Sequence, residues 1–113
     1  MFSSTSFAEW TKVSEDVDGN IHYMDFERIR KHDGFVYYWT LSDLLKPDKE
    51  GDLSYKHYRQ TDCKLFRYKN LSNSYHKEPM GGGIGEVNNL ESEWTYPTPN
   101  SVFETMLKIT CGG

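Results

Sequence analysis

The run Phe35-Val-Tyr-Tyr-Trp-Thr-Leu41 constrains the fold more than any other part of this sequence. Its large apolar side chains occupy both odd and even positions, so a strand formed here would present apolar groups to both faces of a sheet. A strand of that kind belongs in the middle of a sheet, where both faces are covered. The sequence therefore predicts a β-sheet built around residues 35–41.

Shorter extended segments flank this central strand and are separated by Gly, Pro, Asp and Asn, the residues that favour turns. Further strands are predicted at Trp10–Ser14, Ile21–Phe26, Leu53–Arg59 and Cys63–Leu71, with Ser72–His76 as another extended segment. Asp18-Gly19 or Gly19-Asn20 would form a hairpin turn, which implies antiparallel pairing. The Gly-containing stretch between Glu78 and Glu93 is expected to be a long loop.

The core of this chain must be built from few but large side chains. Only 36% of the 113 residues are apolar, yet 15% are aromatic, with three Trp, eight Tyr and six Phe. Aromatic side chains suit the half-buried faces of a sheet, whereas helical bundles are rich in Leu, Ala, Glu and Lys. The length indicates one domain, which we place at residues 9–113.

One helix is predicted at the C-terminal end. Ser101-Val-Phe-Glu104 has the pattern of a capping box, in which the serine hydroxyl accepts from the Glu104 amide and the carboxylate reaches back. Phe103, Leu107 and Cys111 would follow one another on a single face of that helix. We therefore expect an α+β fold, a mainly antiparallel sheet of about five to six strands with one C-terminal helix packed on one face.

The chain has two cysteines, Cys63 and Cys111, which could serve in three ways. They could form a disulfide that ties the helix to the sheet, remain two buried thiols, or include a catalytic cysteine paired with a histidine such as His57. An oxidising compartment would favour the disulfide. Because Cys111 lies on the predicted sheet-facing stripe of the helix, a bridge to Cys63 is geometrically sensible.

The first eight residues, Met1 to Ala8, carry no charge and differ in composition from the rest of the chain. Ser6-Phe7-Ala8 places small residues at the positions that a signal peptidase requires, directly before Glu9. We interpret residues 1–8 as the remnant of a signal peptide, with a disordered N-terminus as the alternative. The sequence contains no apolar run long enough for a transmembrane segment.

Several residues and short motifs occur in a characteristic order along the chain. They are Trp10, the segment Tyr23-Met-Asp25 with Ile29, the pair Asp62-Cys63, Gly83-x-Gly85, Trp94, Pro99-Asn-Ser101 and the terminal Cys111. In this order the chain resembles the surface-adhesin protein E-like family of Gram-negative bacteria. The resemblance implies a C-terminal helix tethered by a disulfide, surface location, dimerisation in the best-known member, and adhesion to host matrix proteins. The prototype is a lipoprotein, but no cysteine lies near residue 9, so we expect a periplasmic or secreted protein without a lipid.

The charge distribution singles out one segment. The formal net charge is −4, which argues against nucleic-acid partners. Between Leu53 and Lys77, however, basic residues outnumber acids and alternate with tyrosines. The candidate binding patch comprises Lys56, Arg59, Arg67, Lys69, Lys77, Tyr55, Tyr58 and Tyr68. An acidic glycan or an acidic protein would suit such a patch, whereas the alternative is a solvated face that protects an edge strand.

No complete catalytic or metal-binding set is apparent. His22, His32, His57 and His76 are scattered without ligand spacing, and no nucleotide-binding motif ends the Gly81–Gly85 run. The sequence therefore predicts no catalytic residue, metal or cofactor. We expect an exported, non-enzymatic binding or adhesion module with an extracellular matrix or polyanionic partner. The alternative is a structural envelope protein that works by self-association or strand pairing.

Overall fold

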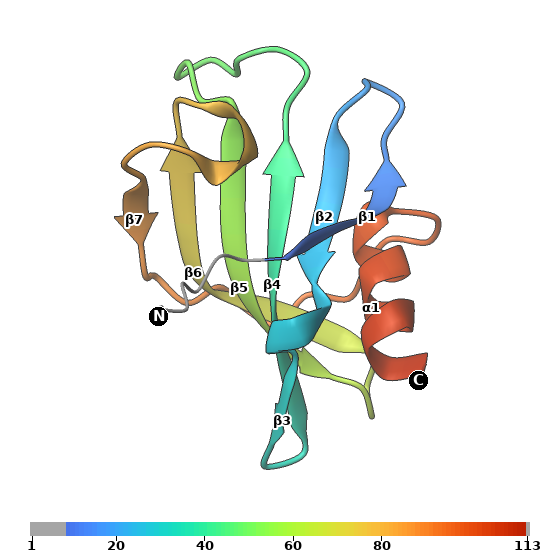
Figure 1. The fold of residues 1–113 in the computed structure, drawn as a ribbon. Helices are drawn as coiled ribbons and strands as arrows, with labels where there is room; N and C mark the ends of the chain where they lie inside the picture. The colour runs from blue at the N-terminus through green and yellow to red at the C-terminus, as the bar shows by residue number, and fades with distance from the viewer. Residues whose placement is uncertain (1–8, 113) are drawn as a thin grey trace, which may run out of the picture.

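Phe35–Asp43 forms β4, a central strand in the computed structural model of this protein, which describes residues 9–112 (Figure 1). It pairs with β2 on one side and with β5 on the other. Side chains of both parities are buried along it, including Tyr38 and Thr40 on one face and Leu41 on the other. The prediction of a central strand here is confirmed.

The remaining strands continue a single antiparallel sheet. Its strand order is β1-β2-β4-β5-β6-β7, and β3 pairs with β4 off this path. The strands are β1 (Trp10–Glu15), β2 (Ile21–Asp25), β3 (Arg30–His32), β4 (Phe35–Asp43), β5 (Ser54–Asp62), β6 (Arg67–His76) and β7 (Glu86–Asn88). The predicted fold class, a mainly antiparallel sheet with one C-terminal helix, is confirmed.

The connection between β5 and β6 differs from the prediction of a strand beginning at Cys63. The strand β6 begins at Arg67, and Cys63 lies in the turn before it. Asp62 holds this turn, because its Oδ1 accepts from the backbone amides of Lys64 at 3.2 Å and Leu65 at 3.3 Å. Aspartate commonly closes turns in this way. Residues 63–66 therefore form a turn, although the sequence predicted the start of a strand there.

Two strands were missed because they are short and exposed, with Val87 as the one apolar residue among their six. The strand β3 lies between the predicted strands Ile21–Phe26 and Phe35–Leu41, and it follows the 3-10 turn η1 (Phe26–Arg28). The expected loop between Glu78 and Glu93 contains a second 3-10 turn, η2 (Pro79–Gly81), and then β7. All residues of β3 and β7 are exposed, so burial contributes little to these strands, which pair through their backbones with β4 and β6.

The helix α1 (Val102–Gly112) begins where the capping pattern predicts. The backbone amide of Glu104 donates to Ser101 Oγ at 3.2 Å, and Glu104 Oε1 accepts from the amide of Asn100 at 2.9 Å. The carboxylate thus reaches one residue further back than expected. Leu107 is fully buried, whereas Phe103 at the margin of the helix face remains 39% exposed.

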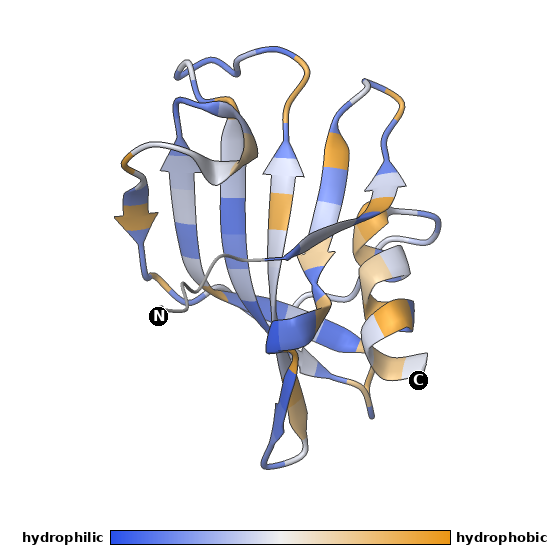
Figure 2. Cartoon of the chain, viewed as in Figure 1, coloured by the Kyte–Doolittle hydropathy of each residue, from blue (hydrophilic) through white to orange (hydrophobic). Residues whose placement is uncertain are grey.

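The core lies between α1 and the sheet, with Met24, Tyr38 and Met106 at its centre. Figure 2 shows few strongly hydrophobic positions in the strands and more of them on α1. Large aromatic and sulfur-containing side chains therefore supply most of the buried volume, as the composition indicates. No helix within residues 9–112 is long and apolar enough to cross a membrane.

A disulfide joins Cys63 to Cys111, with an S–S distance of 2.07 Å and a Cα–Cα distance of 5.4 Å. It connects the last turn of α1 to the turn after β5, so the predicted bridge is confirmed. The predicted signal remnant at residues 1–8 lies outside the described residues.

Side chains of the sheet divide into two sets, which define two faces. Residues directly opposite each other on paired strands point to the same face. The helix face, which contacts α1, carries Tyr38 paired with Arg59. The outer face, on the opposite side, carries Trp39 paired with Tyr58.

One end of the outer face is covered by the η2 turn. Ser54 Oγ donates to the carbonyl oxygen of Glu78 at 2.6 Å and accepts from the Gly81 amide at 2.8 Å. Gly81 has φ +70°, and a Cβ there would lie 2.4 Å from Lys56 Cε. Glycine at this position lets the turn lie directly over the Lys56 side chain.

Candidate functional site

The eight residues of the candidate patch lie on both faces of the sheet. Alternation along β5 and β6 places Tyr55, Arg59 and Tyr68 on the helix face. The same alternation places Lys56, Tyr58, Arg67 and Lys69 on the outer face, and Lys77 follows the end of β6. The structure therefore brings four of the eight together on one surface, and the binding role of the set stays a prediction.

Three of the five basic residues of the candidate patch already pair with carboxylates. Arg67 Nε lies 2.9 Å from Asp62 Oδ2, Lys69 Nζ lies 2.5 Å from Glu91 Oε2, and Lys77 Nζ lies 3.0 Å from Asp52 Oδ1. The ion pair lowers the pKa of Asp62 against the opposing effect of its burial, which is the larger single influence. The positive charge available to an acidic partner is therefore smaller than the sequence suggests.

On the outer face, aromatic side chains contact one another and form a more continuous surface than the basic side chains do. The Trp39 and Tyr58 ring centroids lie 4.9 Å apart, and those of Tyr37 and Tyr58 lie 6.1 Å apart. Phe35 stacks on Trp94 at 5.8 Å. We call these five half-exposed residues, Phe35, Tyr37, Trp39, Tyr58 and Trp94, the outer aromatic cluster.

Two cations cover Trp94 and extend this cluster. The Arg67 guanidinium lies 4.4 Å from the Trp94 ring centroid, and Lys69 Nζ lies 4.7 Å from it. Cation–π contacts and ion pairs hold both side chains in place against the sheet. The sequence predicted Tyr58, Arg67 and Lys69 as patch residues but not Trp94, because Trp94 lies outside the named strands, in a segment held against β6 by contacts at Ser92 and Thr95.

A pocket on the helix face was not predicted. It has a volume of about 380 Å³ and lies between the start of α1 and strands β2, β4 and β5. Its lining includes His22, Ser42, His57, Arg59, Phe103 and Met106. These residues come from four separate elements, so only the strand register brings them together, and no local motif in the sequence signals the pocket.

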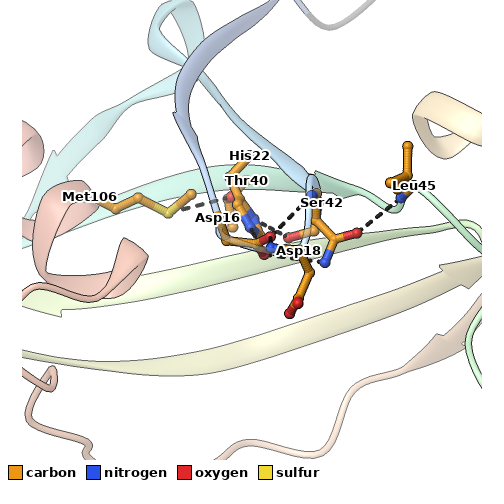
Figure 3. Close-up of polar contacts among 8 residues, drawn as sticks. Asp16, Asp18, His22, Thr40, Ser42, Leu45 and Met106 are labelled. Atoms are coloured by element: carbon orange, nitrogen blue, oxygen red, sulfur yellow. Dashed lines mark hydrogen bonds and ion pairs between the residues drawn. The ribbon is translucent and has the colours of Figure 1, made fainter.

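Polar contacts fix one wall of this pocket, as Figure 3 shows. His22 Nε2 lies 3.1 Å from Asp16 Oδ2, and His22 Nδ1 lies 2.9 Å from Ser42 Oγ. Asp16 also accepts from the backbone amides of Asp18 and Asn20, both at 3.0 Å. This network ties the turn between β1 and β2 to β4. Within residues 9–112 no three or more His, Cys, Asp or Glu side chains gather in a way that could hold a metal ion.

The pocket lining also contains His57, whose pKa is lowered to about 4, first by burial and then by the nearby charge of Arg59. His57 Nδ1 lies 2.6 Å from Asn73 Oδ1. Since an amide oxygen only accepts, Nδ1 carries the proton and the ring is neutral near pH 7.

We expect acid to weaken the fold through His57. The pKa of this histidine is near its ordinary value of 6.5 in the unfolded chain but only about 4 in the folded one, so below pH 6.5 the unfolded state binds more protons. The free energy of unfolding should therefore fall between pH 6.5 and pH 4, with a slope of up to about 1.4 kcal/mol per pH unit. Urea unfolding as a function of pH checks this. His57→Gln should flatten the pH dependence of the free energy of unfolding in this interval. His32→Gln, at an exposed position, is the control and should not change it. An unchanged pH dependence in His57→Gln would contradict the lowered pKa of His57.

The family model described as surface-adhesin protein E matches residues 10–112. The chain belongs to the surface-adhesin protein E family. This confirms the resemblance seen in the sequence.

Solved structures agree with the family assignment at the level of the fold. A crystal structure of Haemophilus influenzae protein E has a TM-score of 0.71 at 15% identity, covering 97% of this chain and 92% of that chain. A structure of protein E from non-typeable Haemophilus influenzae has a TM-score of 0.65 at 14% identity, covering 97% of this chain and 80% of that chain. No curated protein sequence matches this chain.

Proposed function

We propose that this protein is an exported, non-enzymatic adhesion module that binds an extracellular matrix protein through the outer aromatic cluster. Membership of a surface-adhesin family supports the adhesive role and the exported location. The disulfide is in keeping with an oxidising compartment outside the cytoplasm.

The observation that carries the proposal is the composition of the outer face. Trp, Tyr and Arg are the residues that most often contribute binding energy at protein interfaces. Here Trp39, Tyr58 and Trp94 are half-exposed on one surface, next to Arg67. Stacking already orders these rings, so little side-chain entropy remains to be lost on binding.

Charged residues are expected to contribute less to binding than the aromatic residues of the outer face. Arg67, Lys69 and Lys77 each pair with a carboxylate. Lys56, the remaining basic residue of the patch on the outer face, has no carboxylate partner within residues 9–112. A partner with a few acidic groups around an apolar centre suits this surface better than a strong polyanion. We therefore expect binding to weaken only modestly as the salt concentration rises.

Features of the sheet edges bear on the alternative of strand pairing. The edge strand β1 is irregular, with a register shift between Lys12 and Ser14, and the opposite edge β7 has three residues. Irregular and short edges limit pairing with further strands. Dimerisation and the role of a structural envelope protein stay predictions from the sequence.

Substitution of the aromatic cluster tests the proposal. We expect Trp39→Ala and Trp94→Ala each to weaken binding to a responsive matrix protein about tenfold or more, as for central interface residues. Surface plasmon resonance against a panel of immobilised matrix proteins provides the measurement. Ile109→Ala, on the exposed side of α1, is the matched control and should bind as the unaltered protein does. Equal binding by all three variants, with folding confirmed by circular dichroism, would contradict the proposal.

A further inference from the structure

Arg59 on the helix face is a charged side chain with few partners. Its residue surface is only 4% exposed. Its Nε donates to Asn70 Oδ1 at 2.8 Å, and Nη1 donates to Met106 Sδ at 3.4 Å. A guanidinium has five N–H donors, so these two contacts leave most of them free for another acceptor.

No carboxylate oxygen within residues 9–112 lies within 4.0 Å of the Arg59 guanidinium, in contrast to Arg67, which pairs with Asp62 at 2.9 Å. A buried charge without a counter-charge is unfavourable, and proteins normally supply one. Arg59 lies over the rings of Tyr68 and Phe103, at 5.2 Å and 4.8 Å from their centroids. Those rings attract the cation weakly. The face of an aromatic ring carries no lone pair, so the N–H groups of the guanidinium, which point outward in its plane, need other acceptors.

The Arg59 side chain lines the pocket of about 380 Å³ on the helix face. The pocket begins at the first turn of α1, where Val102 and Phe103 contribute to its wall. The N-terminal end of a helix carries a partial positive charge. Ser101 and Glu104 already cap that end of the helix, so the Arg59 guanidinium is the group that favours an anion in this space.

The acid that borders the same pocket is already engaged. Asp16 Oδ1 accepts two backbone amides, and its Oδ2 accepts from Asn20 Nδ2 at 3.2 Å and lies 3.1 Å from His22 Nε2. A carboxylate offers about four acceptor positions, and these four contacts use them. Asp16 therefore does not serve as the counter-ion of Arg59.

Two further groups of the pocket are acceptors of hydrogen bonds. Because His57 Nδ1 donates to Asn73 Oδ1 at 2.6 Å, its Nε2 is left with a lone pair. Ser42 Oγ lies against His22 Nδ1 at 2.9 Å and retains acceptor capacity. The side chains of Phe103 and Met106 form an apolar wall. One fixed cation, acceptors for hydroxyl groups and an apolar wall match a carboxylate that also carries hydroxyls and a ring.

We propose that this pocket binds a sugar acid, such as a uronic acid residue, with the carboxylate held by Arg59, hydroxyls donated to His57 and Ser42, and the ring against Phe103. The pocket is on the face opposite the outer aromatic cluster. The proposal is therefore independent of the proposed adhesion to a protein, and each can fail without the other.

Nuclear magnetic resonance titration of the whole protein with D-glucuronate tests it, with D-glucose and acetate as comparison probes. We expect saturable shifts of the Met106 methyl group and of the His57 and Arg59 amides at millimolar glucuronate. D-glucose lacks the carboxylate and acetate lacks the ring and hydroxyls, so both should bind at least tenfold more weakly.

Arg59→Met should abolish the glucuronate shifts without lowering the melting temperature, because it removes a buried charge and keeps an unbranched side chain that can pack in the same place. Arg67→Met on the outer face is the matched control and should titrate as the unaltered protein does. Should Arg59→Met fail to fold, Val102→Trp fills the pocket while keeping Arg59, and it should also abolish the shifts.

Three results would overturn the proposal. They are the absence of saturable shifts at these positions, equal affinity for acetate and glucuronate, and shifts confined to the outer-face residues Arg67 and Lys69.

Discussion

Replacing Cys63 with serine is expected to lower the melting temperature by about 15 °C. The bridge to Cys111 closes a loop with a sequence separation of 48 residues. In the chain-entropy model a loop of this length contributes about 4 kcal/mol to the free energy of unfolding. For a domain of this size each kcal/mol corresponds to about 4 °C. The total stability of such a domain is on the order of 5–15 kcal/mol, so this loss is a large fraction of it.

The helix should loosen first in this variant, because the bridge holds the C-terminal turn of α1 at the turn after β5. Thermal unfolding by circular dichroism measures the effect on stability, and hydrogen exchange of the α1 amides measures the local effect. The double variant Cys63→Ser with Cys111→Ser is the matched control, since it removes any exchange reaction of the remaining thiol. A melting curve equal to that of the unaltered protein would contradict the structural role of the bridge.

Much of the fold could be predicted because its signals are local. The apolar run Phe35–Leu41 is central, and Ser101 and Glu104 cap the helix, as expected. The helical repeat places Cys111 on the predicted sheet-facing stripe of the helix, and the structure joins it there to Cys63. The strands β3 and β7 were missed because each has only three residues, all exposed, which is too short for a periodic signal.

The surfaces could be predicted only in part, because they depend on register. Along β5 and β6 the basic and tyrosine residues alternate between faces, so a cluster in the sequence divides in space. Arg59 illustrates the difficulty: its position in a charged segment suggests an exposed residue, yet its opposite neighbour Tyr38 and the helix bury it. The pocket beside Arg59 requires the pairing of β4 with both β2 and β5, which no single segment encodes.

Removing the side chain of Met106 should have an effect similar in size to loss of the disulfide. Met106 is 1% exposed and packs against Met24 and Tyr38 at the centre of the core. Its sulfur also accepts from Arg59 Nη1 at 3.4 Å and from Thr40 Oγ1 at 3.5 Å. Replacement of a buried methionine by alanine typically costs about 2–5 kcal/mol through lost contacts and the cavity that remains. We expect Met106→Ala to lower the free energy of unfolding by this amount, as measured by urea unfolding.

Two further variants separate the origins of this effect. Met106→Leu keeps most of the volume and should cost less than about 1.5 kcal/mol, since only the weak sulfur acceptor is lost. Ile109→Ala, on the exposed side of the same helix at 38% exposure, is the control for helix propensity and should change stability by about 0.5 kcal/mol or less. If Met106→Ala lowered the free energy of unfolding as little as this control does, Met106 would not be packed in the core between α1 and the sheet. In the Cys63→Ser background Met106→Ala should cost less than in the unaltered protein, because both changes act on the attachment of one helix and such effects do not add.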